Sequence, residues 1–136
     1  MGYTKAEMLQ YLKKNISSLN ILPVYIVRSS NFFENRTDEI IKIMEFARSR
    51  LLIIRSSSVL EDTEGYSNAG KFKSVLNVAP DSIHIEEAVA DVYASYETNT
   101  DEQILIQPML ENIKSSGVVF TSDMETFAEY YTVNYN

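Results

Sequence analysis

One arginine in this sequence stands where a side chain could bind phosphate. Arg55 follows the apolar run at residues 51–54 and precedes three serines at residues 56–58. A guanidinium group has a planar fork of N–H donors that matches two phosphate oxygens, and nearby hydroxyls and turning backbone amides add further donors. The pattern therefore fits phosphate recognition by Arg55. A structural ion pair with Glu61 or Asp62 explains the same arginine equally well.

Further basic side chains flank the same strand and loop, although the chain carries a net charge of -7. The basic residues of this stretch are Arg48, Arg50, Arg55, Lys71 and Lys73. A local positive potential inside a negative field attracts nucleotide phosphates. Solvated lysines at strand ends are nevertheless the commoner explanation of such a pattern.

Two other segments contain the residue types that contact a nucleotide. Gly70 and Ser74 provide a small residue and a hydroxyl just before an expected strand, which permits close approach of the backbone to a ligand. Further along the chain, Gln107 and then Pro108 interrupt the apolar segment 104–109. Proline has no amide hydrogen for a strand ladder, so the backbone is expected to leave the sheet there and expose an edge that adenine could use. Taken alone, a strand that merely ends explains this segment better.

Other kinds of site find little support in the sequence. There is no cysteine, and the single histidine, His84, falls in an acidic helical stretch where a surface position is the simpler explanation. Neither a G-x-G-x-x-G motif nor a Walker lysine motif occurs. Adjacent carboxylates such as Glu61 with Asp62, or Glu86 with Glu87, do not face one site on a helix or strand. We therefore predict no metal ligands in this chain.

Composition and charge indicate the class of protein. The chain has 136 residues, of which 45% are hydrophobic and 23% charged, so it has the size and composition of one globular domain, which we place at residues 1–136. The negative charge disfavours nucleic acid and anionic membranes as partners. No apolar run approaches the roughly 20 residues that span a bilayer, and the N-terminus does not resemble a signal peptide. We expect a cytoplasmic protein.

Apolar periodicity and capping signals predict the elements that must position these residues. A helix is expected at residues 5–15, where Thr4 and Glu7 form a capping box, and a second is expected to be capped by Thr37. Pro80 and Asp81 should begin a third helix. Six strands are predicted at residues 21–27, 51–54, 72–78, 103–109, 117–121 and 130–135.

Finer expectations concern the middle of the chain. Residues 31–37 read as a polar linker, and residues 56–70 as a long loop. The strand at residues 51–54 should be covered on both faces and end at Arg55, and Pro23 places the first strand at a sheet edge. The second helix should bury Ile40, Ile41, Met44 and Ala47. The result is an α+β fold with a mixed or mostly antiparallel sheet and about three helices.

Taken together, these segments resemble the N-terminal ATP-grasp nucleotide-binding domain of the phosphoenolpyruvate synthase and pyruvate phosphate dikinase family. Residues 54–62, IRSSSVLED, are similar to the family signature V-R-S-S-x-x-x-E-D. Residues 67–78, SNAGKFKSVLNV, resemble the glycine-containing lid segment. Residues 106–110, IQPML, resemble the hinge between the two lobes, and residues 116–123, SGVVFTSD, resemble the next strand.

The resemblance implies that the chain is part of an ATP-grasp fold in which Arg55 binds the phosphates of ATP. Lys5, in a segment that loosely matches a lysine segment of the family, would assist Arg55. The segment around Gly70 and Ser74 would close over the nucleotide. The adenine would be held by Gln107, Met109 and the backbone at Leu110.

The sequence also departs from the family pattern. Tyr3 and Thr4 stand where a Gly-Gly pair usually precedes the lysine, and Ser74 replaces the commoner threonine while keeping the hydroxyl. Lys71 stands where glutamine is common. The tail at residues 129–136 lacks a glycine-rich phosphate segment and looks more like a divergent branch that includes small-molecule kinases resembling glutamine kinase.

By this resemblance the chain is the ATP-binding portion of an ATP-dependent phosphotransferase. Its cofactors would be ATP and Mg²⁺, with the magnesium ligands outside this chain, and its partners an unidentified phosphate acceptor, the C-terminal lobe and a carrier domain. The alternative is a non-catalytic nucleotide-sensing or protein-interaction module with the same fold. We expect this chain alone to be inactive, to bind ATP weakly or not at all because it presents one side of a two-lobed site, and to self-associate through exposed apolar residues such as Tyr130, Tyr131 and Val133.

Overall fold

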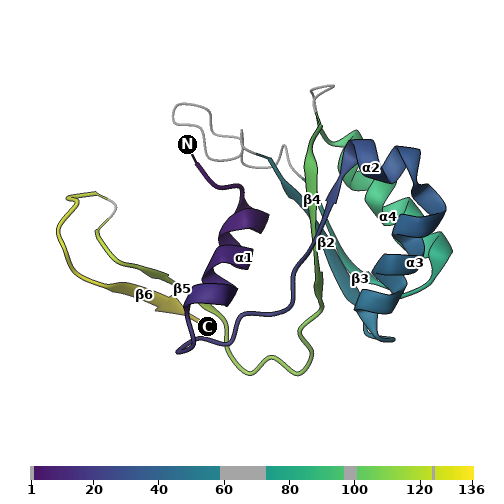
Figure 1. Ribbon diagram of the computed structural model, residues 1–136. Coiled ribbons are helices and arrows are strands. Elements are labelled where there is room, and N and C mark those ends of the chain that lie inside the picture. Colours follow the sequence, from purple (N-terminus) through teal and green to yellow (C-terminus); the bar gives the residue numbers. More distant parts are fainter. Residues whose placement is uncertain (1, 59–72, 97–100, 124) are drawn as a thin grey trace.

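The computed structural model describes residues 2–58, 73–96, 101–123 and 125–136 (Figure 1). These residues form four helices and six strands, which agrees with the predicted α+β class but adds one helix. In chain order they are α1 (Lys5–Asn15), β1 (Tyr25–Arg28), α2 (Ser29–Glu34), α3 (Arg36–Ala47), β2 (Leu52–Ser57), β3 (Ser74–Val78), α4 (Ser82–Ala94), β4 (Gln103–Pro108), β5 (Gly117–Phe120) and β6 (Thr132–Tyr135).

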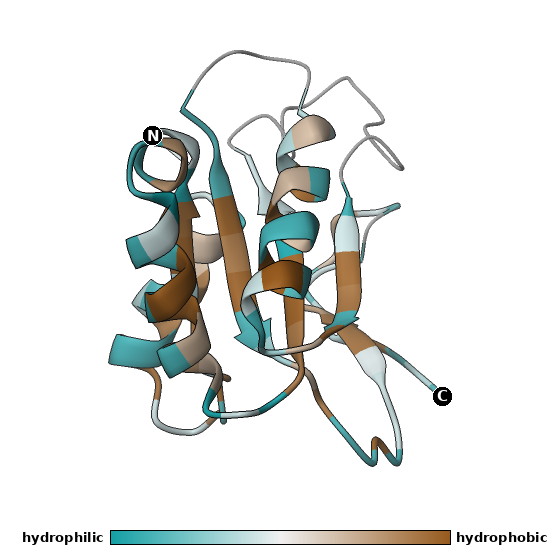
Figure 2. Ribbon diagram, turned by 90° about the vertical axis from the view of Figure 1, so that its right-hand side faces the viewer, coloured by the Kyte–Doolittle hydropathy of each residue, from teal (hydrophilic) through white to brown (hydrophobic). Residues whose placement is uncertain are grey.

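A four-stranded sheet in the order β1-β4-β2-β3 forms the centre of the fold, and every pair of neighbouring strands is antiparallel. Helices α2, α3 and α4 cover one face of this sheet, and α1 lies on the other side (Figure 1). The strands behind the three helices are hydrophobic along most of their length (Figure 2). As Pro23 predicted, β1 is an edge strand.

The main hydrophobic core lies between this sheet and helices α2, α3 and α4. Side chains from the helices, including Phe32, Ile43 and Val89, pack against Ile54 and Ile106 of the central strands. All five are fully buried. Burial of a side chain of this size contributes about 1.5–3 kcal/mol, so this layer fixes the sheet as a platform.

Two helices begin where the sequence predicts. Thr4 and Glu7 form the expected capping box of α1, in which the Glu7 amide donates to Thr4 Oγ1 and the Thr4 amide donates to Glu7 Oε2. Asp81 caps α4 by accepting a hydrogen bond from the His84 amide. These side chains satisfy backbone N–H groups that a helix start leaves without partners.

The prediction of a polar linker at residues 31–37 is wrong. Residues Ser29–Glu34 form α2, because Phe32 is fully buried in the core and anchors a turn that the polar residues around it would not hold alone. Helix α3 then begins at Arg36, and its N-cap position is Asn35 rather than Thr37.

The predicted buried face of α3 is only half right. Ile40 and Ala47 are buried, but Ile43 lies between them, while Ile41 and Met44 are exposed. Both sets have helical spacing, so periodicity alone does not choose between them. Packing against α4 and the sheet rotates the helix so that Ile43 enters the core.

Strand β2 does not end at Arg55 but continues to Ser57. It lies between β4 and β3, and its pairing with β4 runs without interruption from Leu52 opposite Pro108 to Ser57 opposite Gln103. Ladder hydrogen bonds to the neighbouring strand outweigh the change from apolar to polar side chains. Ile53 is only partly buried, so the two faces of β2 are not equally covered.

The last two predicted strands form a separate antiparallel hairpin, β5 and β6, in which Gly117 lies opposite Tyr135 and Val119 opposite Val133. A side chain on Gly117 would clash, since an added Cβ would meet the Asn134 carbonyl oxygen of the neighbouring strand. Among the described residues, none of the helices has the length and the apolar character that crossing a bilayer requires.

Candidate functional site

The strand register places several predicted ligand-binding residues on one face of the sheet. Residues directly opposite each other in an antiparallel pair point to the same face, and residues two apart along a strand do so as well. Arg55 lies opposite Ser74 of β3 and Leu105 of β4. Gln107 lies opposite Ile53, which is two residues from Arg55. The side chains of Arg55, Ser74 and Gln107 therefore share a face.

This face is the one that α1 contacts. Ser57, which is two residues from Arg55, accepts a hydrogen bond through Oγ from the Ala6 amide at 2.9 Å. Gln103, opposite Ser57, accepts a hydrogen bond from Thr4 Oγ1 at 2.8 Å. The opposite face carries Ile54 and its neighbours in the helical core. We call the first of these the α1 face; its polar members on β2, β3 and β4 are Arg55, Ser57, Ser74, Gln103 and Gln107.

Arg55 itself occupies the middle of this face rather than a loop. Its backbone is held by β3 and β4, and its side chain is partly buried. The competing explanation for Arg55, an ion pair with Glu61 or Asp62, involves residues outside the described part of the chain. Gly70, predicted to close over a nucleotide, also lies outside the described residues.

The backbone at the end of β4 leaves the sheet at a slightly different position from the one that the sequence predicts. Pro108 still lies opposite Leu52, and the Met109 amide donates to the Leu51 carbonyl oxygen at 2.8 Å. The backbone therefore leaves the sheet after Met109, one residue later than proline chemistry alone suggests. Gln107 is buried with only 7% of its surface exposed, whereas Leu110 is 57% exposed.

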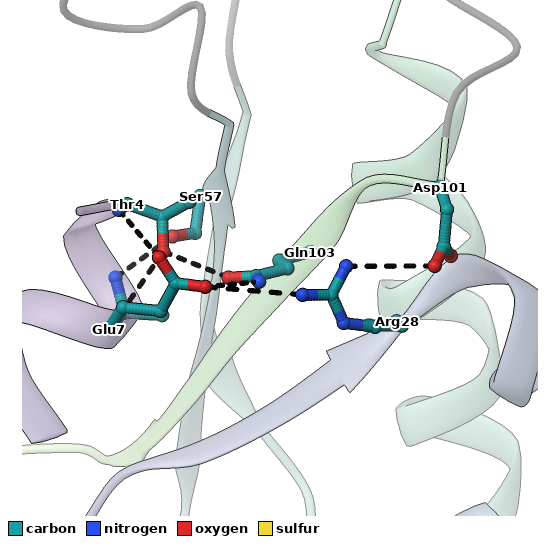
Figure 3. A network of polar contacts seen from close by, with 7 residues as sticks. Thr4, Glu7, Arg28, Ser57, Asp101 and Gln103 are labelled. Carbon is teal, nitrogen blue, oxygen red and sulfur yellow. Dashed lines mark hydrogen bonds and ion pairs between the residues drawn. The ribbon is translucent and has the colours of Figure 1, made fainter. Parts of the chain in front are cut away.

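A polar network holds the first turn of α1 on the sheet (Figure 3). Gln103 accepts from Thr4 and donates through Nε2 to Glu7 Oε1 at 3.0 Å. Arg28 of β1 lies 3.9 Å from the same Glu7 oxygen and 3.6 Å from Asp101 Oδ2. Hydrogen bonds from the Thr4 amide and from Gln103, together with the charge of Arg28, hold the pKa of the Glu7 carboxyl below its ordinary value.

Two further hydrogen bonds connect this network to the end of α4. The hydroxyl of Tyr96, just beyond that helix, donates to the Gln103 carbonyl oxygen and accepts from the Ser57 amide. The contacts between α1 and the sheet could not be found from sequence spacing, because they join residues as distant as Thr4 and Gln103, 99 positions apart. Gln103 and Tyr96 are thus residues of the site region that sequence reasoning missed, whereas Ser57 is one of the serines that it placed beside Arg55.

Two of the basic residues expected beside Arg55 are engaged elsewhere, and a third, Lys71, lies outside the described residues. Arg50 donates to the carbonyl oxygens of Ala47 and Phe46 at the end of α3. Lys73 pairs with Asp91 of α4 at 3.0 Å, which places it on the helical side of the sheet. Both charges are engaged away from the α1 face, so Arg55 does not gain its local field from them.

His84 lies beside the carboxylate of Asp81 at the protein surface. His84 Nδ1 lies 2.7 Å from Asp81 Oδ2 at the exposed start of α4, in agreement with a surface role. Among the residues that the structure describes, no group of three or more histidine, aspartate or glutamate side chains could hold a metal ion.

The fold and this face define an α+β domain with a sheet that carries a helical core on one side and polar side chains on the other. The family described as the AMP/ATP-binding domain of pyruvate phosphate dikinase matches residues 27–135. The chain belongs to this family, whose members are nucleotide-binding domains of kinases of the pyruvate phosphate dikinase type. Neither a curated protein nor a solved structure matches the chain. Helix α1 and Lys5 precede the matched residues.

Proposed function

We propose that this chain is the ATP-binding portion of an ATP-dependent phosphotransferase, and that ATP binds on the α1 face. The observation that carries the proposal is the register, which aligns Arg55, Ser74 and Gln107 on one face. That face is turned away from the helical core and lies within the residues that match a nucleotide-binding family.

The α1 face offers separate groups for the two parts of ATP. Arg55 and Ser74, in the middle of the face, supply a bidentate guanidinium and a hydroxyl for phosphate oxygens, and Lys5 of α1 adds a second cation toward the Ser57–Gln103 end. Gln107, Met109 and the backbone at Leu110 contact the adenine at the other end. Gln103, beside α1, and Gln107 are four positions apart on β4, which corresponds to about 13 Å along a strand.

The residues of the α1 face favour the nucleotide rather than a metal ion. Guanidinium, ammonium, hydroxyl and amide groups bind anions and bases, whereas Mg²⁺ takes oxygen ligands that are mostly carboxylates. Mg²⁺ would enter with ATP and neutralise charge on the phosphates, held by carboxylates outside this chain. Residues of this chain would bind and orient the nucleotide, and the phosphate acceptor would be bound elsewhere.

Binding measurements with three ligands test the proposal. ATP, adenosine and tripolyphosphate should each bind the chain, as detected by ligand-observed NMR and, where affinity permits, by calorimetry. ATP should bind most tightly because it reaches both ends of the face, and adenosine and tripolyphosphate should each compete with it. Absence of ATP binding, or tripolyphosphate that binds without displacing ATP, would contradict the proposal.

A further inference from the structure

The side chain of Gln103 bridges the two residues that cap α1. Its Oε1 accepts from Thr4 Oγ1 at 2.8 Å, and its Nε2 donates to Glu7 Oε1 at 3.0 Å. Thr4 is the N-cap of the helix and Glu7 closes the capping box. Gln103 is only 5% exposed and its hydrogen bond with Thr4 is buried, whereas the bond with Glu7 is partly exposed because the Glu7 side chain is 37% exposed. One buried amide of the sheet therefore engages both side chains of the capping box (Figure 3).

Hydrophobic packing supplies only part of the docking of α1. Within Lys5–Asn15, Ala6 is the one fully buried residue, and its side chain removes only a small apolar area from water, while Leu9 and Leu12 are partly buried. The polar contacts of the first turn add to this packing and fix the start of the helix on the sheet. Loss of one partner of a buried hydrogen bond costs more than the bond itself contributes, because the other partner stays unsatisfied.

Lys5 lies between two residues that these contacts hold on the sheet. Thr4 is bound through its hydroxyl to Gln103, and Ala6 is bound through its amide to Ser57 Oγ. Gln103 and Ser57 are opposite each other, and Ser57 is two residues from Arg55 on the same face. The backbone of Lys5 is therefore fixed at the Ser57–Gln103 end of the α1 face, next to Arg55 in the middle of that face.

We propose that Gln103 is a positioning residue of the nucleotide site, which acts through the capping box of α1 to place Lys5 beside the phosphates. Gln103 does not itself contact the nucleotide. A small displacement of a charged group from its ligand is enough to weaken their interaction strongly. Release of the first turn of α1 would therefore remove the contribution of Lys5 to phosphate binding and leave adenine binding unchanged. This inference rests on the proposed function.

A double-mutant cycle between Gln103 and Lys5 tests the inference, with ATP and adenosine as ligands. Gln103→Met keeps nearly the same shape and removes both hydrogen bonds. It should weaken ATP binding about tenfold, roughly as much as Lys5→Ala, and should leave adenosine binding unchanged. In the Lys5→Ala background, Gln103→Met should have no further effect on ATP. An equal loss in both backgrounds, or an equal loss for adenosine, would overturn the inference.

A ligand-free measurement and a matched control complete the test. Hydrogen exchange of the α1 amides should accelerate in Gln103→Met and in Thr4→Val. The second variant removes the hydrogen bond between Thr4 and Gln103 from the helix side, and it replaces Gln103→Met in the test if that variant does not fold. Tyr25→Phe removes a side-chain hydrogen bond to the buried Glu39, which lies on the helical side of the sheet, and should change neither α1 exchange nor ATP affinity. Unchanged α1 exchange in both α1-side variants would overturn the inference.

The outcomes separate the inference from the proposed function. If the unaltered chain does not bind ATP, the proposed function fails and the inference fails with it. If the chain binds ATP but Lys5→Ala leaves the affinity unchanged, only the positioning role of Gln103 fails.

Discussion

Arg55 is held between Ser74 and Leu105 in neighbouring strands, so its backbone is rigid while its partly buried side chain remains on the α1 face. A cation placed on a rigid strand loses less entropy on binding a ligand than one placed in a loop. This setting makes Arg55 the residue whose contribution to phosphate binding is most directly measurable.

Replacing Arg55 should weaken ATP binding. A hydrogen bond to a charged group contributes about 1.5–3 kcal/mol, so Arg55→Ala should lower the affinity about ten to a hundredfold, measured by calorimetry. Arg55→Lys should restore it only in part, because one ammonium cannot reproduce the bidentate fork. Lys73→Ala, on the helical side, is the control and should leave ATP affinity unchanged. A folded Arg55→Ala protein with unaltered affinity would remove this residue from the site.

Met109 gives a prediction for the other end of the face. If its side chain packs on the adenine, Met109→Asp should weaken the binding of ATP and adenosine alike, because a carboxylate is poorly accommodated against an apolar ring. Affinity for tripolyphosphate should hardly change, and the ratio of the three affinities is the measurement. A matched loss for all three ligands would indicate a general structural effect and would contradict base recognition by Met109.

At the scale of elements, polar contacts of the first turn help to fix α1 on the sheet, and the charge of Glu7 makes this docking sensitive to pH. The pKa of Glu7 is lowered first by the hydrogen bond from the Thr4 amide and then by the bond from Gln103. Since the folded pKa lies below the unfolded one, the Glu7 carboxylate stabilises the fold above the ordinary glutamate pKa of about 4.3. This contribution is lost as pH falls from there through the lowered value.

The variant Glu7→Gln isolates this effect. It should have a smaller free energy of unfolding than the unaltered chain at pH 7, and the difference should shrink as pH falls below about 4. Chemical denaturation across pH measures the difference. Glu45→Gln, on the exposed surface of α3, should show a much smaller change over the same range. A difference for Glu7→Gln that did not vary with pH would rule out the charge as its cause.

At the scale of the whole molecule, the hairpin of β5 and β6 exposes an apolar face. Val119, Val133 and Tyr135 share one face by register, and each is more than half exposed. Tyr131, just before β6, is 76% exposed. Unpartnered apolar surface of this kind promotes association, and edge strands can exchange between copies.

We therefore expect concentration-dependent self-association of the chain, measured by analytical ultracentrifugation. Val133→Lys should reduce it, because a charge would be carried into the contact. Leu19→Lys introduces the same charge at another exposed apolar position, after α1, and should leave association unchanged. Equal association of Val133→Lys and the unaltered chain would show that the hairpin is not the contact.

The sequence by itself determined those features whose causes are local. The capping box of Thr4 and Glu7 and the cap at Asp81 predicted the starts of α1 and α4, because cap and helix are joined by three residues of chain. Apolar runs predicted all six strands to within a few residues, and the signature around Arg55 predicted the family that the match to residues 27–135 confirms. The roles of the individual site residues stay predictions.

Only the tertiary structure decided which side chains share a face. Periodicity gave α3 two possible apolar faces, and packing with the sheet selected the one with Ile43. Strand register brought Arg55, Ser74 and Gln107 to the α1 face and sent Lys73 to the helical side. The contact of Gln103 with Thr4 joins residues 99 apart. Such contacts depend on which elements meet and in what register, and residue spacing along the chain carries no record of that.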